Sequence, residues 1–559
     1  PSGSFQNINR RYDIVYGDVM LNFNYNIRRF DIAATLGWTG RYENMNNMRV
    51  STNGGLVTEN WFDLNASRYT ASSTLQRMEL LKTGYMGTLS LGWDNYLFLE
   101  LTGRQERSST LKDQSFFYPS ANLSFLFSNA FRMPAWWNHG KLRLSYGVVG
   151  NAPETYAANI IYEQGSDNGF TWNYVPSSWG NANIRPEKKY EYEIGFESKF
   201  LNNRLGFDVS YYNNRVKDQI LSTPQPSTSG VKYVLMNVGE VANEGWDISV
   251  SATPVLTKNF RWDLTANGIY RNKVVKLADG VPYLEISNIG GGGAKIQAVE
   301  GRPMGDIYVQ VPQMNENGEY LVSDKGLYMN QTELQRVGNI NPDGVGGLFS
   351  SFSYKNIFLD FSIDFRIGGD VINEMYQYST ASGLTPESLQ FRDTEHGGLS
   401  YYYPGNNNAS GVPVQVDPSL GAGPNGETVY HDGVILPGVV ASTGEKNTRI
   451  IPAGYYYNQT YNWGTQPEQL TYRHSVFDNS YVKLRELTIG YQFPEKLISK
   501  LGMTRLSVSV FGRNLFYFYK ALKNYDAESS VGTSWASQAV VGGSTTATRN
   551  FGVSLRASF

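Results

Sequence analysis

The stretch Phe551-Gly-Val-Ser-Leu-Arg-Ala-Ser-Phe559 decides the fold, because its side chains alternate in character from one residue to the next. One face carries Phe551, Val553, Leu555, Ala557 and Phe559, and the other carries Gly552, Ser554, Arg556 and Ser558. A period of two is the period of a β-strand. The stretch is therefore predicted to be a strand with one apolar face and one polar face, and 487–493 and 506–512 show the same pattern.

This alternation recurs along the whole chain. It predicts about fifteen strands, most of them ten residues or longer, which is the length needed to cross a bilayer at a tilt. The predicted strands are 16–27, 30–42, 84–93, 96–107, 115–128, 141–151, 190–200, 204–216, 238–252, 260–273, 344–354, 357–368, 481–493, 503–516 and 548–559.

The connections between these strands alternate between short and long. Arg28-Arg29, Asp94-Asn95 and Lys355-Asn356 are typical of tight hairpin turns. The long connections are 43–83, 152–189, 274–343, 369–479 and 521–547. Short turns at one end and long loops at the other are typical of outer-membrane barrels.

Composition decides which face lies inside. Only 41% of the 559 residues are hydrophobic, and charged residues make up 18% against about 25% in an average protein. The polar faces nevertheless carry charge, as at Glu191, Glu193 and Glu197. A barrel of this many strands is too wide to fill with apolar side chains. If the sheet closes into a barrel with its apolar face toward lipid, every backbone N–H and C=O group pairs with a neighbouring strand, which is necessary because lipid offers no hydrogen-bond partners.

The predicted fold is therefore all-β: a transmembrane antiparallel β-barrel with long extracellular loops and short periplasmic turns. Phe551, Val553, Leu555 and Phe559 are expected to face lipid, and Arg556 and Ser558 the lumen. Because single-chain bacterial barrels have an even number of strands, we expect residues 1–559 to be the C-terminal part of a larger barrel. The formal net charge of -2 gives no indication of a nucleic-acid partner, and the absence of Cys excludes thiolate chemistry.

Several segments, spread over most of the chain, resemble one family in the family's own order. They are similar to segments of SusC-like (SusC/RagA) TonB-dependent transporters of Bacteroidetes. Ala527 stands where the family usually has Pro, and this difference affects the expected conformation of one loop and not the resemblance to the family. The segments are 142–151, 184–189, 193–205, 211–214, 238–247, 301–306, 475–494, 514–515 and 525–528.

The resemblance implies a 22-stranded barrel, of which about fifteen strands are present here. It also implies an N-terminal plug and a TonB box, neither recognisable in this sequence. The implied function is TonB-driven import of a large nutrient across the outer membrane, with a SusD-like lipoprotein as a lid and a dimer of transporter–lid pairs. An oligosaccharide is the expected cargo and an oligopeptide the second candidate. Two alternatives stay open: a passive porin-like channel, and a structural or adhesin barrel that binds a partner protein.

No catalytic constellation is recognisable, and we expect no enzymatic activity and no resident cofactor. The long loops are instead rich in aromatic residues, which suit sugar rings as well as peptides and protein partners. Packing within the loop, or against a partner protein, is the alternative for each of them. The candidates for cargo contact are Trp172, Tyr174, Trp179, Tyr401, Tyr402, Tyr403, Tyr455, Tyr456, Tyr457 and Trp463.

Two acidic or Asn-rich segments offer oxygen ligands of the kind that calcium takes. They are Asn315-Glu-Asn-Gly318 and Asn341-Pro-Asp-Gly344. Neither has the full ligand series of an EF-hand, and both are typical turn sequences. Calcium binding in the loops is therefore a secondary expectation, with turn formation as the alternative.

Overall fold

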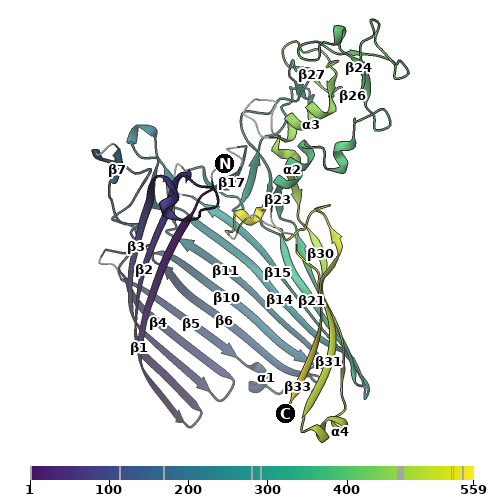
Figure 1. Cartoon of the computed structure of the whole chain (residues 1–559). Helices are drawn as coiled ribbons and strands as arrows, with labels where there is room; N and C mark the ends of the chain where they lie inside the picture. The colour runs from purple at the N-terminus through teal and green to yellow at the C-terminus, as the bar shows by residue number, and fades with distance from the viewer. Residues whose placement is uncertain are drawn as a thin grey trace. The chain divides into compact units, whose positions relative to one another are not determined.

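One large antiparallel sheet, the wall, dominates the computed structural model, which describes residues 3–112, 115–167, 170–277, 281–289, 293–462, 471–529, 532, 534–543 and 547–559. Its strand order follows the sequence (Figure 1). The fifteen strands are β1 Gln6–Ile27, β2 Phe30–Leu56, β3 Ser67–Trp93, β4 Leu97–Ser108, β5 Ser115–Phe125, β6 Trp137–Asn151, β10 Glu187–Phe200, β11 Leu205–Lys217, β14 Glu240–Leu256, β15 Phe260–Lys276, β21 Gly344–Tyr354, β22 Ile357–Ile367, β30 Tyr481–Gln492, β31 Arg505–Lys520 and β33 Asn550–Ser558. The predicted fold class and all fifteen predicted strands are confirmed.

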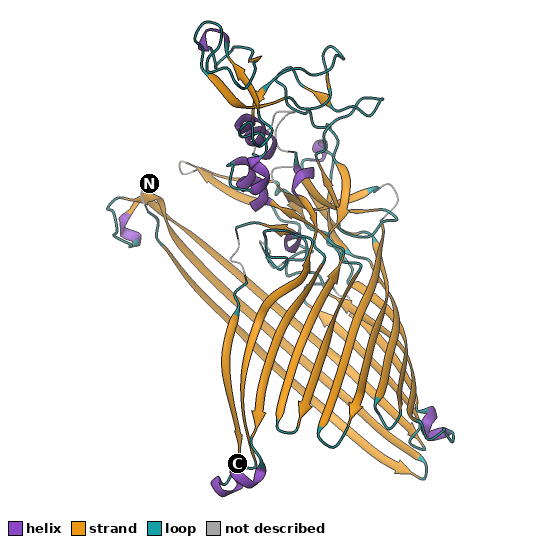
Figure 2. Ribbon diagram, turned by 90° about the vertical axis from the view of Figure 1, so that its right-hand side faces the viewer, coloured by secondary structure: helices purple, strands orange, loops and turns teal. Residues whose placement is uncertain are grey.

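The short connections form hairpins at one end of the strands. Between β3 and β4, Asp94 and Asn95 both have positive φ, of 52° and 57°, a region that Asp and Asn tolerate better than most residues. Arg28 (φ 55°) and Lys355 (φ 55°) occupy the same region in their hairpins. Two of the short connections contain helical turns, α1 Phe127–Ala130 and α4 Glu495–Ile498, which Figure 2 shows beyond the strand ends.

The connection predicted at 43–83 is wrong in its extent. β2 continues to Leu56 and β3 begins at Ser67, so each strand has 27 residues and the connection is only 57–66. The register stays regular as far as Ser51, which lies opposite Ser72, and it shifts between Ser51 and Leu56. The extension carries polar residues on both faces among a few apolar ones, so the alternation is interrupted there and the sequence pattern does not reveal the strands.

The other long connections carry small sheets of their own. In the first half of the chain these are formed by β7 Glu163–Asp167, β8 Phe170–Tyr174, β9 Ser178–Trp179, β12 Ile220–Pro224 and β13 Tyr233–Asn237. Later strands are β16 Tyr283–Ile289, β17 Ala294–Val299, β18 Asp306–Val309, β19 Leu321–Val322, β20 Gln335–Asn339, β23 Asp370–Asn373, β24 Leu399–Tyr402, β25 Val414–Gln415, β26 Val429–Val434, β27 Val439–Val440, β28 Ile451–Pro452, β29 Val476–Asp478 and β32 Val540–Val541.

Two helices, α2 Glu374–Ala381 and α3 Ala453–Tyr461, belong to the largest connection. Within the described residues, none of the helices has the length and apolar character required to span a membrane. A buried cluster that includes Ile296, Ile307, Ile372 and Tyr472 joins the small sheets of this half of the chain. The long connections are therefore folded structures with apolar cores.

The chain divides into two compact units. The first comprises 1–248 and 276–279, and the second comprises 249–275 and 280–559. The first unit contains β1 to β11 of the wall and the connections between them. The second contains β15 to β33 of the wall together with the large connections after β15 and β22.

Candidate functional site

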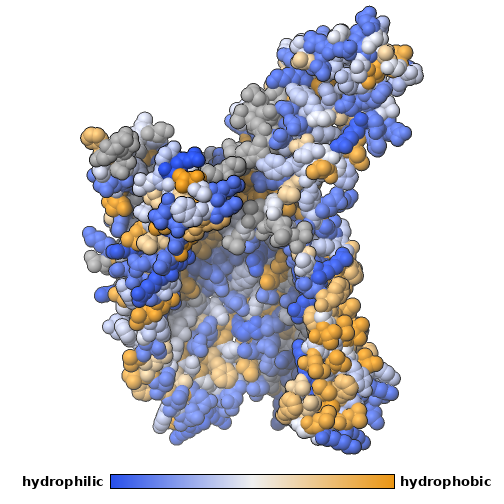
Figure 3. Space-filling view, viewed as in Figure 1, coloured by the Kyte–Doolittle hydropathy of each residue, from blue (hydrophilic) through white to orange (hydrophobic). Residues whose placement is uncertain are grey.

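The last strands of the wall present an apolar face. On β33 the side chains of Phe551, Val553 and Leu555 are 74%, 70% and 70% exposed. Val553 lies opposite Val510 of β31, whose side chain is also exposed. Apolar side chains gather over the lower part of β31 and β33 in Figure 3. Phe559 follows the end of β33 and is exposed as well. An exposed apolar band of this kind suits a lipid environment, and the lipid-facing assignment stays a prediction.

The polar face of the first unit is lined by paired charges. Arg143 of β6 donates to Asp208 of β11 at 2.6 Å and lies 3.5 Å from Glu197 of β10. To reach Asp208, the guanidinium crosses over Gly195, where a Cβ atom would lie 2.8 Å from Arg143 Nε. The glycine therefore makes room for an ion pair that spans three strands. Arg104 and Glu106 of β4 form another pair at 2.9 Å.

The polar face of the second unit carries a larger network. Arg485 of β30 donates to Asp364 of β22 at 2.6 Å and to Glu528 at 2.5 Å. Lys483, only 2% exposed, lies 2.5 Å from the same Glu528 carboxylate. Glu528 belongs to the connection between β31 and β33, so the network fastens this connection to the wall. Burial raises the pKa of Glu528, but the hydrogen bonds from Arg485 and Lys483 outweigh it, and the pKa lies below its usual range.

Three aromatic side chains form a row on β8 in the first unit, which we call the aromatic row. Phe170, Trp172 and Tyr174 alternate along the strand, so they share one face, and they are 78%, 48% and 43% exposed. Trp172 lies opposite Gly165 of β7, where a Cβ atom would lie 2.7 Å from the indole ring. Phe170 was not among the predicted contacts, although the period of two at 170, 172 and 174 was visible in the sequence.

The other predicted aromatic residues fall into two groups. Tyr401 and Tyr457 are buried: the Tyr401 hydroxyl donates to Asp432 at 3.1 Å, and that of Tyr457 donates to the Glu387 carbonyl at 2.8 Å. Their burial favours the packing alternative over cargo contact. The second group comprises the exposed Tyr455 and the partly buried Trp179, Tyr402, Tyr403 and Tyr456, while Trp463 lies outside the described residues.

An aromatic core holds the largest connection together. Tyr461 of α3 lies 6.0 Å from Tyr376 of α2 and 5.5 Å from the ring of His474, measured between ring centroids. Burial and the neighbouring Arg473 lower the pKa of His474 to about 4. The imidazole is therefore neutral in the folded connection at physiological pH.

The two calcium candidates act as turns in this structure. The Asn315 side-chain carbonyl accepts from the backbone N–H groups of Asn317 and Glu319, at 3.0 and 2.9 Å. Asn341 donates to the Asn339 side chain at 2.9 Å, and its carbonyl accepts from the Trp535 indole at 3.2 Å. Within the described residues, no cluster of three or more His, Asp or Glu side chains could hold a metal. These contacts favour the turn alternative.

Comparison with known proteins decides the family. The model of the family described as "TonB dependent receptor-like, beta-barrel" matches residues 1–307. The chain belongs to this family. Its predicted location in the outer membrane is thereby confirmed.

The relatives agree with the resemblance that the sequence indicated. TonB-dependent receptor P3 of Formosa agariphila is 22% identical over 494 residues, covering 80% of this chain and 42% of that protein. TonB-dependent receptor SusC of Bacteroides thetaiotaomicron is 27% identical over 256 residues, covering 40% of this chain and 24% of SusC. The chain therefore spans less than half the length of these curated relatives.

The fold is also similar to a solved structure, the RagAB peptide importer in its open-open state. The TM-score is 0.69 at 18% identity, and the match covers 99% of this chain and 56% of that chain. At this identity the likeness shows the fold alone. The resemblance to SusC- and RagA-type proteins is thus confirmed by both sequence and fold.

Proposed function

We propose that this chain forms part of the wall of an active outer-membrane importer, and that its cargo is a large polar nutrient, an oligosaccharide first of all. The family supports the transport role, and the charge-paired polar faces suit a hydrated pathway. An N-terminal plug and TonB coupling belong to the proposal, as do a SusD-like lid and a dimer of transporter–lid pairs. The similarity to SusC supports these parts of the proposal.

The aromatic row is the observation that carries the cargo class. Three exposed rings on one face of a strand, at successive positions two residues apart, offer a flat apolar track. Sugar rings present apolar C–H faces to such a track, while their hydroxyl groups remain free for polar partners. An extended oligosaccharide can therefore contact all three rings at once. RagAB is named a peptide importer, and an oligopeptide is accordingly the second cargo class.

An uptake assay tests this proposal. Cells that express the full-length protein receive a labelled oligosaccharide mixture or a labelled oligopeptide mixture, and accumulation is measured for wild type and for Trp172→Ala. We expect oligosaccharide accumulation and a several-fold loss in the variant. Trp61→Ala is the matched control, because Trp61 is an exposed tryptophan in another connection. Accumulation of the peptide mixture alone would show that the cargo is an oligopeptide. Equal uptake by the two variants would show that the aromatic row does not contact the cargo.

A further inference from the structure

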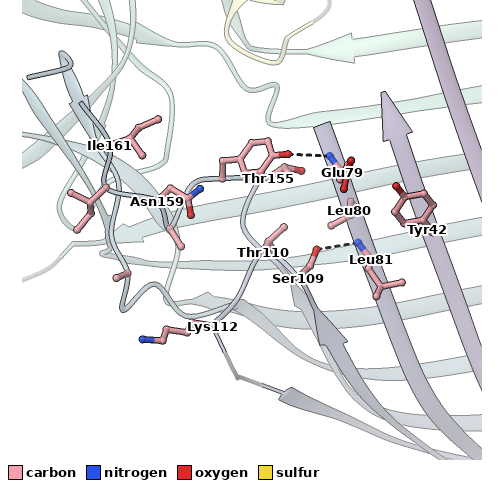
Figure 4. A pocket seen from close by; sticks show the side chains of 14 residues that line it. Tyr42, Glu79, Leu80, Leu81, Ser109, Thr110, Lys112, Thr155, Asn159 and Ile161 are labelled. Atoms are coloured by element: carbon pink, nitrogen blue, oxygen red, sulfur yellow. Dashed lines mark hydrogen bonds between the residues drawn. The ribbon is translucent and has the colours of Figure 1, made fainter. Parts of the chain in front are cut away.

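A cavity of about 800 Å³ lies in the first unit, between the wall and the connection that follows β6 (Figure 4). Its apolar lining comes from Tyr42, Leu80 and Leu81 of the wall and from Ala158, Ile160 and Ile161 of the connection. The volume falls in the range of small-molecule sites. Neither the transport role nor the aromatic row uses this cavity.

The cavity exists because β3 is longer than its neighbour. β4 ends at Ser108, whereas β3 extends back to Ser67, so part of the β3 edge has no strand beside it. Side chains replace the missing strand: Leu81 N–H donates to Ser109 Oγ at 3.0 Å, and Glu79 N–H donates to the Tyr156 hydroxyl at 3.2 Å. The bond from Glu79 fixes the connection after β6 against the edge of the wall. The bond from Leu81 reaches Ser109, which belongs to the connection between β4 and β5, and Figure 4 shows both bonds.

The register shows which face of the wall borders the cavity. Tyr42 lies opposite Leu81, and on the same face Trp38 lies opposite Tyr85. The other face of β2 carries Arg41, which is paired with Glu43 at 2.7 Å. Tyr42 and Leu81 therefore belong to the apolar face, which in an outer-membrane barrel borders lipid. Leu80 lies opposite Glu43 and belongs to the other face.

The height of the cavity follows from strand geometry. Tyr42 comes twelve residues after Phe30, the first residue of β2. At about 3.3 Å per residue this is about 40 Å of strand. With a tilt of about 45° it corresponds to about 28 Å of height, close to the thickness of the hydrocarbon layer. Tyr42 and Leu81 thus lie at the outer boundary of that layer.

The connection after β6 contributes apolar side chains to the lining, next to the polar Thr155 and Asn159. Ile160 and Ile161 line the cavity and are 51% and 62% exposed. Two charged residues also line the cavity, Glu79 of β3 and Lys112 of the connection between β4 and β5, and no carboxylate of the described residues pairs with Lys112. An apolar cavity that is continuous with the lipid face and has a cation on its lining matches an amphiphile with an anionic head.

We propose that this cavity binds an acyl chain of an outer-leaflet lipid, with the Lys112 ammonium facing the anionic headgroup. The bound lipid fills the space between the wall and the connection, and so holds the connection after β6 in place. This inference goes beyond the proposed transport function and does not depend on the cargo.

Fluorescence quenching in lipid nanodiscs tests the proposal. The chain has no Cys, so Ile161→Cys provides a single labelling site. The full-length protein carries a fluorophore there, and the nanodisc lipid carries a spin label on its acyl chain. We expect quenching several-fold stronger than at Val412→Cys, an exposed position in the largest connection. Equal quenching at the two positions would overturn the proposal.

A cavity-filling variant separates occupancy from mere closeness to the bilayer. Ala182 lines the cavity, and Ala182→Trp fills part of it. This substitution is expected to reduce quenching at Ile161→Cys, while the heat-dependent gel shift of the folded barrel stays unchanged. Lys112→Ala is expected to abolish the preference for anionic over zwitterionic spin-labelled lipid. Quenching that persists in Ala182→Trp would contradict lipid occupancy. Loss of quenching at Ile161→Cys as the protein concentration rises would also contradict it, and would indicate that a second copy of the chain covers the cavity.

Discussion

At the scale of single residues, the assignment of the two faces of β33 predicts opposite effects of a charged substitution at neighbouring positions. Val553 is exposed on the apolar face, and Ser554 lies on the other face. Val553→Arg should lower the free energy of unfolding by about 2–4 kcal/mol if the position is near the middle of the bilayer. Ser554→Arg should cost far less, because its charge would enter water. Denaturant titration in lipid vesicles measures both, and equal tolerance at the two positions would reverse the assignment of the faces.

His474 predicts a pH dependence of the largest connection. Its pKa is about 4 in the folded protein and about 6.5 when unfolded, so the unfolded state binds more protons between these values. The stability of the connection should therefore fall as pH falls from about 6.5 to about 4. The protection factors of α2 and α3 in hydrogen exchange, corrected for the intrinsic exchange rate at each pH, measure this.

The matching variants for this prediction are His474→Gln and His396→Gln. The first removes the group that titrates, so the protection factors of α2 and α3, which are corrected for the intrinsic exchange rate at each pH, should lose their dependence on pH in this window. The second changes an exposed histidine of the same connection, which contacts Asp393 at 2.7 Å, and should leave the dependence intact. A dependence that survives His474→Gln would assign the effect to another group.

At the scale of elements, the connection between β31 and β33 acts as a strut. Its β32 pairs in parallel with β23 of the largest connection, while Glu528 binds Arg485 and Lys483 of β30. Glu528→Gln leaves Lys483 buried beside a neutral group, and breaking a buried pair costs about 3–5 kcal/mol. We expect faster hydrogen exchange in β32 and β23, which mass spectrometry of their peptides measures.

Glu486→Gln is the matched control for the strut. Like Glu528→Gln, it removes one negative charge, but on β30. Glu486 pairs with Arg513 at 2.8 Å, and both side chains are substantially exposed. An exposed pair of this kind contributes about 1 kcal/mol or less. Because the folded-state pKa of Glu528 is lowered, its contribution is present above the ordinary carboxyl pKa and is lost as pH falls through the lowered value. Similar exchange in both variants would rule out the strut.

The elements also show what sequence patterns can and cannot predict. Every strand of the wall that crosses the lipid layer alternates in polarity, since lipid lies on one face only, and the alternation predicted all fifteen. In the outer halves of β2 and β3, polar residues such as Asn44, Asn47 and Glu79 interrupt the alternation, so their sequence shows no clear period of two. Burial of Tyr401 depends on Asp432 and Tyr430, thirty residues away, and no local pattern indicates such a contact.

At the scale of the whole molecule, the wall and its connections have separate roles. The wall provides an apolar face for lipid and polar faces with paired charges, in the fold of the TonB-dependent receptor-like family. The connections are folded structures that present the aromatic row, the strut and the proposed lipid cavity. Removing the aromatic row should therefore impair uptake without lowering the stability of the wall, and Trp172→Ala should unfold at the same denaturant concentration as wild type.

The energy dependence of cargo accumulation tests most directly the claim that the full-length protein is an active importer. Accumulation of the labelled oligosaccharide mixture is measured in cells that express the full-length protein, with and without an uncoupler of the proton motive force. Active import predicts accumulation above the external concentration, and its loss when the uncoupler is added. Entry that only equilibrates with the medium and is indifferent to the uncoupler would contradict the account and indicate a passive channel.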